Sequence, residues 1–187
     1  MAQKRKDWNG LISGFKASDL MFLDESGCNT DMTRRYAYSL GGSRAVDSAP
    51  LSKPKNTTIL SSIQLDGTLR YTTFSGGTTV ERFKRYLETD LLPHLNGNSV
   101  LIMDNMKSHH AKAVKNLLDS SGIRYIYLPP YSPDLNPIEK LWSKVKSFLR
   151  KFKARTLDAL PNAIQNAFHA VTVSDCSGWF RFCGYAL

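Results

Sequence analysis

The segment at residues 128–142, LPPYSPDLNPIEKLW, constrains the fold more than any other part of the sequence. Its four prolines lie within nine residues. Each proline fixes φ at about −65° and removes a backbone N–H donor, so this stretch cannot continue a helix or lie in the middle of a sheet. An amphipathic helical pattern begins directly after it, over residues 138–152. We therefore expect a stiff arm that delivers one carboxylate, Glu139, to a fixed place at the start of a helix.

The rest of the sequence alternates short apolar runs with helical patterns. Thr78 and Glu81 have the spacing of a capping box, and Asp66-Gly67 marks a tight turn between two strands. Gly41-Gly42, after the run RRYAYSL, indicates a further hairpin. We expect strands at residues 20–24, 57–65, 68–74, 99–104 and 123–128, and helices at 78–92, 108–122, 138–152 and 157–171.

This order is rich in strands first and then alternates strand, helix, strand, helix. It predicts a mixed α/β layer in which one half of the sheet is antiparallel and the other half is parallel. A chain of 187 residues suits one domain with a buried core.

The charge balance favours a polyanionic partner. Lys and Arg number 25 against 16 Asp and Glu, which gives a net charge of +9 and predicts nucleic acid before an acidic membrane surface. The apolar runs are too short to span a membrane, and no apolar segment follows the basic start of the chain, so we expect no membrane partner and no secretory signal. The three cysteines lack metal-ligand spacing and are typical of reduced thiols in a cytoplasmic protein.

Three carboxylates lie at the ends of predicted elements. Asp24 ends the first strand, Asp104 ends the fourth, and Glu139 opens the helix after the fifth. Strand ends beside helix starts are where α/β sheets place ligands. Acids gathered there repel by about 4 kcal/mol per pair at about 4 Å with an effective dielectric near 20, so replacing Asp104 with Ala is expected to relieve repulsion.

A divalent cation would offset that repulsion, and three hard oxygen ligands suit Mg²⁺ or Mn²⁺. Such ions support an in-line attack on a phosphodiester. The alternative is that each acid only caps a helix or starts a loop. Glu25, Asp31 and Asp134 are rival acids nearby, whereas Asp66 precedes Gly and fits a turn.

Three segments resemble the signature blocks of the DDE transposases of bacterial insertion sequences in the mariner-related superfamily. They are FLDESG, LIMDNMKSHH and LPPYSPDLNPIEKLWSKVK. The 34 residues between Asp104 and Glu139 match the spacing in members whose third acid is Glu. The stretches DMTRRYAYSLGGSRAV, SSIQLDG and WFRFCGYA also resemble the bacterial branch. The resemblance covers the chain from about residue 20 to its end.

The resemblance implies a ribonuclease H-like fold, a mixed sheet of five strands flanked by helices, with the first and fourth strands adjacent. It implies that Asp24, Asp104 and Glu139 bind two Mg²⁺ ions, for which Mn²⁺ can substitute. Water would cut the transposon end, and the freed 3′-hydroxyl would attack target DNA at a TA dinucleotide without a covalent enzyme–DNA intermediate. Asn105 and His109 fit contacts to the metal ligands or to a phosphate, and His109 also fits a polar surface position.

Complete members of this superfamily carry an N-terminal helix-turn-helix domain that binds the terminal inverted repeats and act as dimers. We expect that domain to be absent here, with residues 1–19 an extension or linker and 20–187 the catalytic domain. The resemblance implies a second product of a frameshifted gene, partnered by an upstream helix-turn-helix product, or a truncated copy. The expected location is the nucleoid of the bacterial cytoplasm.

Two groups of basic residues are candidates for contact with double-stranded DNA. Lys140 and Lys144 follow the third acid on one side of the predicted helix, and Arg34 and Arg35 lie beside the predicted hairpin. Such contacts bind phosphates without reading sequence.

Two other functions are compatible with these residues. A catalytically inactive DNA-binding remnant would keep the fold and the basic surface, although such a remnant has no reason to keep all three acids. A ribonuclease H-like nuclease acting on hybrids or junctions would share the metal site, but the proline arm and the spacing of the acids argue against it.

Overall fold

A mixed five-stranded sheet forms the centre of the protein, in the order β3-β2-β1-β4-β5. The computed structural model describes residues 2–34, 36–48, 50 and 54–185. The strand β2 is antiparallel to both β1 and β3, whereas β4 runs parallel to β1 and β5 runs parallel to β4. The first and fourth strands are therefore adjacent, as the expected ribonuclease H-like fold requires. The five strands are β1 (Leu20–Cys28), β2 (Thr57–Gln64), β3 (Leu69–Ser75), β4 (Val100–Met103) and β5 (Arg124–Tyr127).

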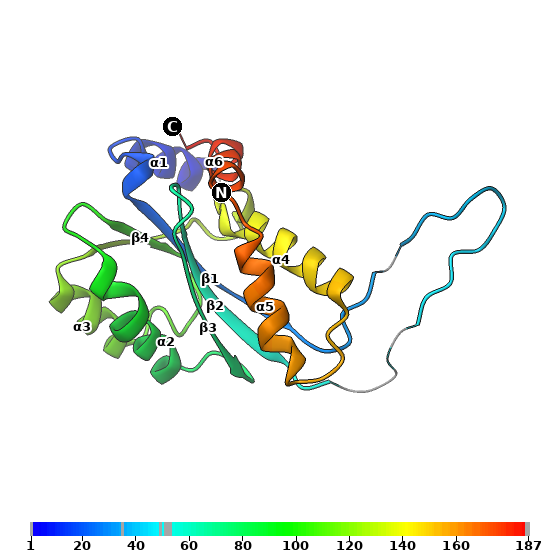
Figure 1. Ribbon diagram of the computed structural model, residues 1–187. Helices are drawn as coiled ribbons and strands as arrows, with labels where there is room; N and C mark the ends of the chain where they lie inside the picture. The colour runs from blue at the N-terminus through cyan, green and yellow to red at the C-terminus, as the bar shows by residue number, and fades with distance from the viewer. Residues whose placement is uncertain (1, 35, 49, 51–53, 186–187) are drawn as a thin grey trace.

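Helices cover both faces of this sheet (Figure 1). On one face lie α2 (Val80–Tyr86) and α3 (Lys112–Ser121), and on the other lie α4 (Ile138–Phe152) and α5 (Ala159–His169). Alternate side chains of β1 supply each side, because successive residues of a strand point to opposite faces. Met21 and Leu23 pack in the α2/α3 core, while Leu20 and Phe22 pack in the α4/α5 core.

Several predicted elements are confirmed at or near their expected bounds. The helix after the proline arm runs over Ile138–Phe152, as its amphipathic pattern predicted. The turn between β2 and β3 contains Gly67 with a φ of 88°, and Asp66 accepts a hydrogen bond from the Thr68 backbone N–H at 2.8 Å. The helix that ends at Gly122 has the left-handed terminus that glycine favours, with a φ of 70°.

The start of two helices differs from the prediction by a few residues. Thr79, not Thr78, caps α2 by accepting a hydrogen bond from the Arg82 backbone N–H at 3.3 Å. This helix changes to a π-helix over Leu87–Leu91 and a 3₁₀ turn over Leu92–His94. Ala111, not Ser108, precedes α3.

Two helices were not predicted. The helix α1 (Ala2–Ile12) occupies part of the expected N-terminal extension, and its Trp8 is only 3% exposed. The helix α6 (Val173–Phe182) begins with a capping box between Thr172 and Asp175. Both lie at the same end of the sheet in Figure 1. No helix in the described part of the chain has the length and apolar character needed to cross a membrane.

A long connection joins β1 to β2 and projects from the rest of the molecule (Figure 1). The hairpin predicted beside Gly41-Gly42 is wrong, since the described residues of 29–56 contain no strand. Their apolar side chains have no sheet face to cover, and Tyr36, Tyr38 and Leu40 are exposed. Arg155 holds the base of this connection by donating hydrogen bonds to the carbonyl of Thr30 at 3.0 Å and to that of Met32 at 3.2 Å.

Candidate active site

The three predicted acids line one cleft of about 440 Å³ at the end of the parallel ladder. Pairing between β1 and β4 stops at Leu23 and Met103, so Asp24 and Asp104 are the first residues beyond it on their strands. The proline arm and the first turn of α4 supply most of the other lining residues. Its lining residues are Asp24, Asp104, Asn105, Met106, Leu128, Pro129, Pro130, Tyr131, Ser132, Pro133, Asn136 and Glu139.

Asp24 does not end its strand, as the sequence had indicated. The strand β1 continues to Cys28 because residues 24–28 still pair with β2 on their other edge. The indole N–H of Trp142, a buried residue of α4, donates a hydrogen bond to Asp24 Oδ2 at 3.0 Å. Burial raises the pKa of Asp24 to about 7, against the effect of that hydrogen bond, and the nearby charges of Glu25 and Asp104 add to the rise.

Asp104 lies in the opposite electrostatic situation. Its Oδ1 accepts a hydrogen bond from the Met106 backbone N–H at 3.0 Å and lies 2.8 Å from His109 Nδ1. Burial acts to raise the pKa of Asp104, but the hydrogen bonds from His109 and Met106 and the charge of the imidazole outweigh burial. The pKa of Asp104 is therefore lowered from its usual value.

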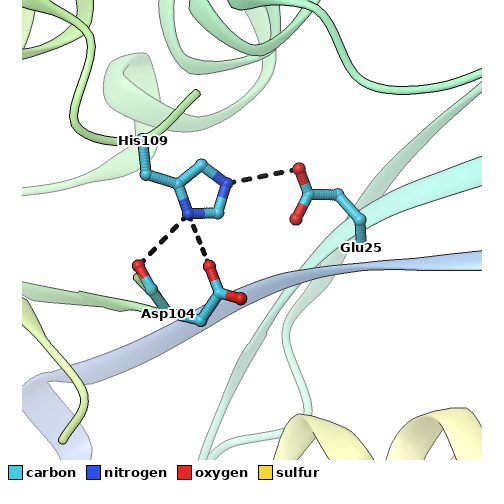
Figure 2. Close-up of side chains that lie close together, drawn as sticks. All are labelled: Glu25, Asp104 and His109. Carbon is cyan, nitrogen blue, oxygen red and sulfur yellow. Dashed lines mark hydrogen bonds and ion pairs between the residues drawn. The ribbon is translucent and has the colours of Figure 1, made fainter. Parts of the chain in front are cut away.

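His109 is fully buried, so its alternative placement on a polar surface is wrong. Its ring stacks on Phe83 of α2 with centroids 4.2 Å apart, and its Nε2 lies 3.2 Å from Glu25 Oε1 (Figure 2). Burial acts to lower the pKa of His109, but its contacts with Asp104 and Glu25 outweigh burial and raise that pKa to about 9. At neutral pH the ring is a cation held between two carboxylates.

Glu25 contacts His109, although the sequence predicted it only as a rival acid near Asp24. It neighbours Asp24 on β1 and therefore points to the other face of the sheet, where His109 lies. Its side chain is only 8% exposed. The strand alternation of two adjacent acids, together with a histidine five residues after Asp104, was the signal that could have found it.

One atom from each of Glu25, Asp104 and His109 lies within 4.8 Å of the others, which is close enough to surround a metal ion. In this arrangement both ring nitrogens of His109 already face carboxylates, since Nδ1 lies 2.8 Å from Asp104 Oδ1 and Nε2 lies 3.2 Å from Glu25 Oε1. We interpret this cluster as an ion-paired imidazolium. The acids of the cleft itself are the better set for a divalent cation.

Glu139 and Asn105 complete the predicted polar set of the cleft. Glu139 lies exposed in the first turn of α4, and its backbone N–H donates to the carbonyl of Asn136 at 3.1 Å. Asn105 donates a hydrogen bond from Nδ2 to the carbonyl of Leu128, and its Oδ1 lies 3.3 Å from His110 Nε2. Asn105 therefore connects the end of β4 to the residue that follows β5.

Lys140, Lys144 and Arg34, which were predicted to contact DNA, are not among the residues that line this cleft. Lys140 places its Nζ 3.8 Å from the ring centroid of Phe182, and Lys144 Nζ lies 2.5 Å from Asp175 Oδ2. Both ammonium groups thus have partners in α6 or at its start. Arg34 is exposed on the β1–β2 connection, and Arg35 lies outside the described residues.

Comparison with known proteins identifies the family. A family model described as DDE superfamily endonuclease matches residues 19–161. The chain belongs to this family. The Tc1 transposase of Caenorhabditis elegans is 29% identical over 97 residues, which is 50% of this chain and 36% of that protein. The Tcb2 transposase of Caenorhabditis briggsae is 31% identical over 75 residues, 40% of this chain and 28% of that protein. The DDE family member described here thus matches about a third of the length of these relatives.

Solved structures of Mos1 transposase share the fold of this DDE domain. A pre-cleavage Mos1 transpososome superposes with a TM-score of 0.81 at 18% identity, over 97% of this chain and 58% of that one. The Mos1 catalytic domain gives 0.68 at 16% identity, over 96% and 85%. Paired-end complexes of Mos1 with Mn and with Mg give 0.75 and 0.70, at 19% and 18% identity, over 95% and 97% of this chain and 57% of theirs. The ribonuclease H-like fold is confirmed.

Proposed function

We propose that this chain is the catalytic domain of a transposase that cleaves DNA at transposon ends and joins the freed 3′-hydroxyl to target DNA at TA dinucleotides. One observation carries the proposal. Asp24, Asp104 and Glu139, from three separate segments, line the same cleft in a domain of the DDE family. The alternative, an inactive DNA-binding remnant, keeps the same fold but makes no use of these acids.

The donor set of the cleft fits divalent cations. Asp24, Asp104 and Glu139 supply the hard carboxylate oxygens that Mg²⁺ and Mn²⁺ bind. Burial raises the pKa of Asp24, so a cation bound beside it would stabilise its charged form. We propose two ions held by these three residues. When bound, such ions polarise the phosphodiester and lower the pKa of the attacking water or hydroxyl.

The other residues of the site position the acids. Trp142 fixes Asp24 through its indole N–H, and His109 fixes Asp104 while Glu25 holds His109 from behind. The proline arm limits the positions open to Glu139, since each proline removes backbone freedom in the unfolded chain. These constraints hold the carboxylates near their bound geometry before DNA arrives, which reduces the ordering that binding requires.

The remaining expectations concern partners and origin. The net charge of +9 supports double-stranded DNA as the partner, with Lys140, Lys144, Arg34 and Arg35 proposed as phosphate contacts. We propose that residues 20–187 form the catalytic domain and that residues 1–19 precede it. We also propose a homodimer as the active form, with an upstream helix-turn-helix product. A bacterial insertion sequence is the proposed source, and the bacterial nucleoid the proposed location, on the motifs DMTRRYAYSLGGSRAV and WFRFCGYA.

The test is cleavage of a supercoiled plasmid that carries the terminal inverted repeats found in the DNA flanking the gene. We expect nicking with Mg²⁺ or Mn²⁺ and none in excess chelator. Asp24→Asn, Asp104→Asn and Glu139→Gln should each lower the rate by at least about 10³-fold, because each removes an anionic ligand of the proposed cations that act on the reacting phosphate. The control is Asp158→Asn, an exposed acid outside the cleft, which should cleave normally.

Cleavage that persists in Asp104→Asn or in chelator would exclude the proposed chemistry. Wild-type protein that binds the plasmid but never cuts it with either metal would favour the inactive remnant.

A further inference from the structure

Tyr131 is an unusual residue on the rim of the acid-lined cleft. It follows Pro130 in a turn of the proline arm, and it is one of the residues that line the cleft. Its side chain is nevertheless 88% exposed. The ring therefore stabilises no core, although it stands beside the candidate catalytic acids.

The backbone of Tyr131 is strained. Its φ of 54° lies in the left-handed region, which L side chains rarely adopt and which is an outlier for a bulky ring. Lys153, with a φ of 56°, is the other described residue apart from glycine in this region. Lys153 ends α4, where a left-handed terminus is common. Tyr131 ends no helix, and Gly or Asn would fit its turn with less strain.

Strain that brings no packing in return indicates a use for the side chain itself. Among the described residues, no hydrogen-bond partner of the Tyr131 hydroxyl is found, so that group does not explain the position. The turn instead places the aromatic ring of Tyr131 at the opening of the cleft. The rigid prolines on either side, Pro130 and Pro133, hold that ring in place.

The residues that line the cleft are of two chemical kinds. Its carboxylates suit a phosphodiester through bound cations. Its apolar side chains are flat or rigid. A nucleotide has the same two parts, a charged phosphate and an apolar base face. The apolar lining residues are Leu128, Pro129, Pro130, Tyr131 and Pro133.

We propose that the ring of Tyr131 stacks on an unpaired nucleobase of the DNA strand whose phosphodiester lies at Asp24, Asp104 and Glu139. This inference rests on the proposed function and names a feature of its substrate. In an intact duplex both faces of a base are covered by its neighbours, so the ring can stack only on a base that is unpaired or at a strand end. The site therefore selects DNA that is locally open beside the reacting phosphate.

Asn136 gives independent support for a ligand bound in this cleft. It lines the cleft, it is only 4% exposed, and its Oδ1 has no hydrogen-bond partner among the described residues. Buried polar atoms without partners are rare in native proteins and call for a ligand, water or strain to explain them. The amino groups of nucleobases are donors of the kind that this oxygen lacks.

The experiment measures DNA binding by the full chain in chelator, where no cleavage occurs. One probe is a duplex with a short 3′ overhang that carries 2-aminopurine, and the other is a blunt duplex with 2-aminopurine in a base pair. We expect wild-type protein to quench the overhang probe and to bind it about tenfold more tightly than the blunt duplex, the size typical of one stacked base.

Four variants test the role of the ring. Tyr131→Phe should keep both quenching and preference, and Tyr131→Ala should lose both. Tyr131→Gly should lose them as well while raising the melting temperature, because it removes the ring and the backbone strain together. Tyr38→Ala, at a fully exposed tyrosine that does not line the cleft, should behave as wild type.

Unchanged quenching and preference in Tyr131→Ala would overturn the proposal. So would a Tyr131→Ala protein that binds both probes normally but changes its sedimentation, since the ring would then contact another protein chain. If the plasmid is not cleaved but the probe is quenched, the proposed function is wrong and the stacking stands. If the plasmid is cleaved but the probe is not quenched, only the stacking is wrong.

Discussion

The two sides of the candidate active site hold their acids by different means. On the β1 side, Asp24 is buried and receives a hydrogen bond from the neutral indole of Trp142, and its pKa rises to about 7. On the β4 side, Asp104 faces the charged ring of His109, and its pKa falls. The cleft thus contains one carboxylate that takes up a proton near neutral pH and one that stays ionised. The charged form of Asp24 therefore destabilises the fold, whereas the charged form of Asp104 stabilises it.

The largest expected effect is the change in the free energy of unfolding when Asp24 loses its charge. The pKa of Asp24 is higher in the folded than in the unfolded state, so its contribution is fully present below pH 3.8 and is lost as pH rises through about 7. Asp24→Asn should therefore be more stable than wild type at pH 8, by up to about 4 kcal/mol for a shift of roughly three units, and similar to it near pH 4. Urea unfolding at both pH values measures this.

Asp104→Asn should change stability in the opposite direction. The lowered pKa of Asp104 gives a contribution that is present above its usual pKa and lost as pH falls through the folded value. At pH 7 the variant leaves the buried His109 with one carboxylate instead of two, so we expect a loss of about 1–3 kcal/mol. We expect the loss of this pair to outweigh the relief of repulsion that the sequence predicted. Equal shifts of one sign in both variants would contradict the comparison.

A smaller effect should appear in metal affinity. Since Asp24 must lose its proton to bind a cation, we expect Mg²⁺ affinity to fall by about tenfold per pH unit below pH 7 and to level off above it. Titration calorimetry across this range measures the break. Trp142→Phe removes the hydrogen bond that lowers the pKa of Asp24, so the break should move to higher pH. A break that stays in place in this variant would show that Asp24 does not set it.

The smallest expected effect is the loss of stability in Glu25→Gln, which changes the carboxylate that contacts His109 Nε2. Glu25→Gln removes one of the two carboxylates that raise the pKa of His109, so this pKa should fall. The raised pKa of His109 stabilises the fold below pH 6.5, and that contribution is lost as pH rises through about 9. The variant should therefore lose about 1 kcal/mol at pH 7 and much less at pH 10. NMR titration of the ring follows its pKa, and an unchanged value would exclude the ion pair.

The sequence predicted the parts of this site that depend on local chemistry. The amphipathic pattern of residues 138–152 and the prolines before it gave both the bounds of α4 and the place of Glu139. The order of apolar runs gave the mixed sheet. The position of Asp24 was harder to predict, because a strand that loses one neighbour and keeps the other looks the same in sequence as a strand that ends.

Contacts between distant segments could not be predicted in the same way. Trp142 is buried, and its hydrogen bond to Asp24 depends on how α4 crosses β1. His109 and Glu25 are 84 positions apart and meet only because the sheet brings β1 beside β4. The helices α1 and α6 have weak or short periodic patterns, so tertiary packing of residues such as Trp8 and Phe180 decides them.

The unequal lengths of β1 and β4 have a consequence for how this site can evolve. The cleft lies where β1 continues past the end of its parallel neighbour β4, so no hydrogen-bond ladder joins Asp24 to Asp104. Lengthening β4 by two residues past Met103 would continue the ladder alongside Asp24. Insertions in the exposed β1–β2 connection would not change the spacing of Asp24 and Asp104. The length of that connection can therefore vary, whereas the length of β4 cannot.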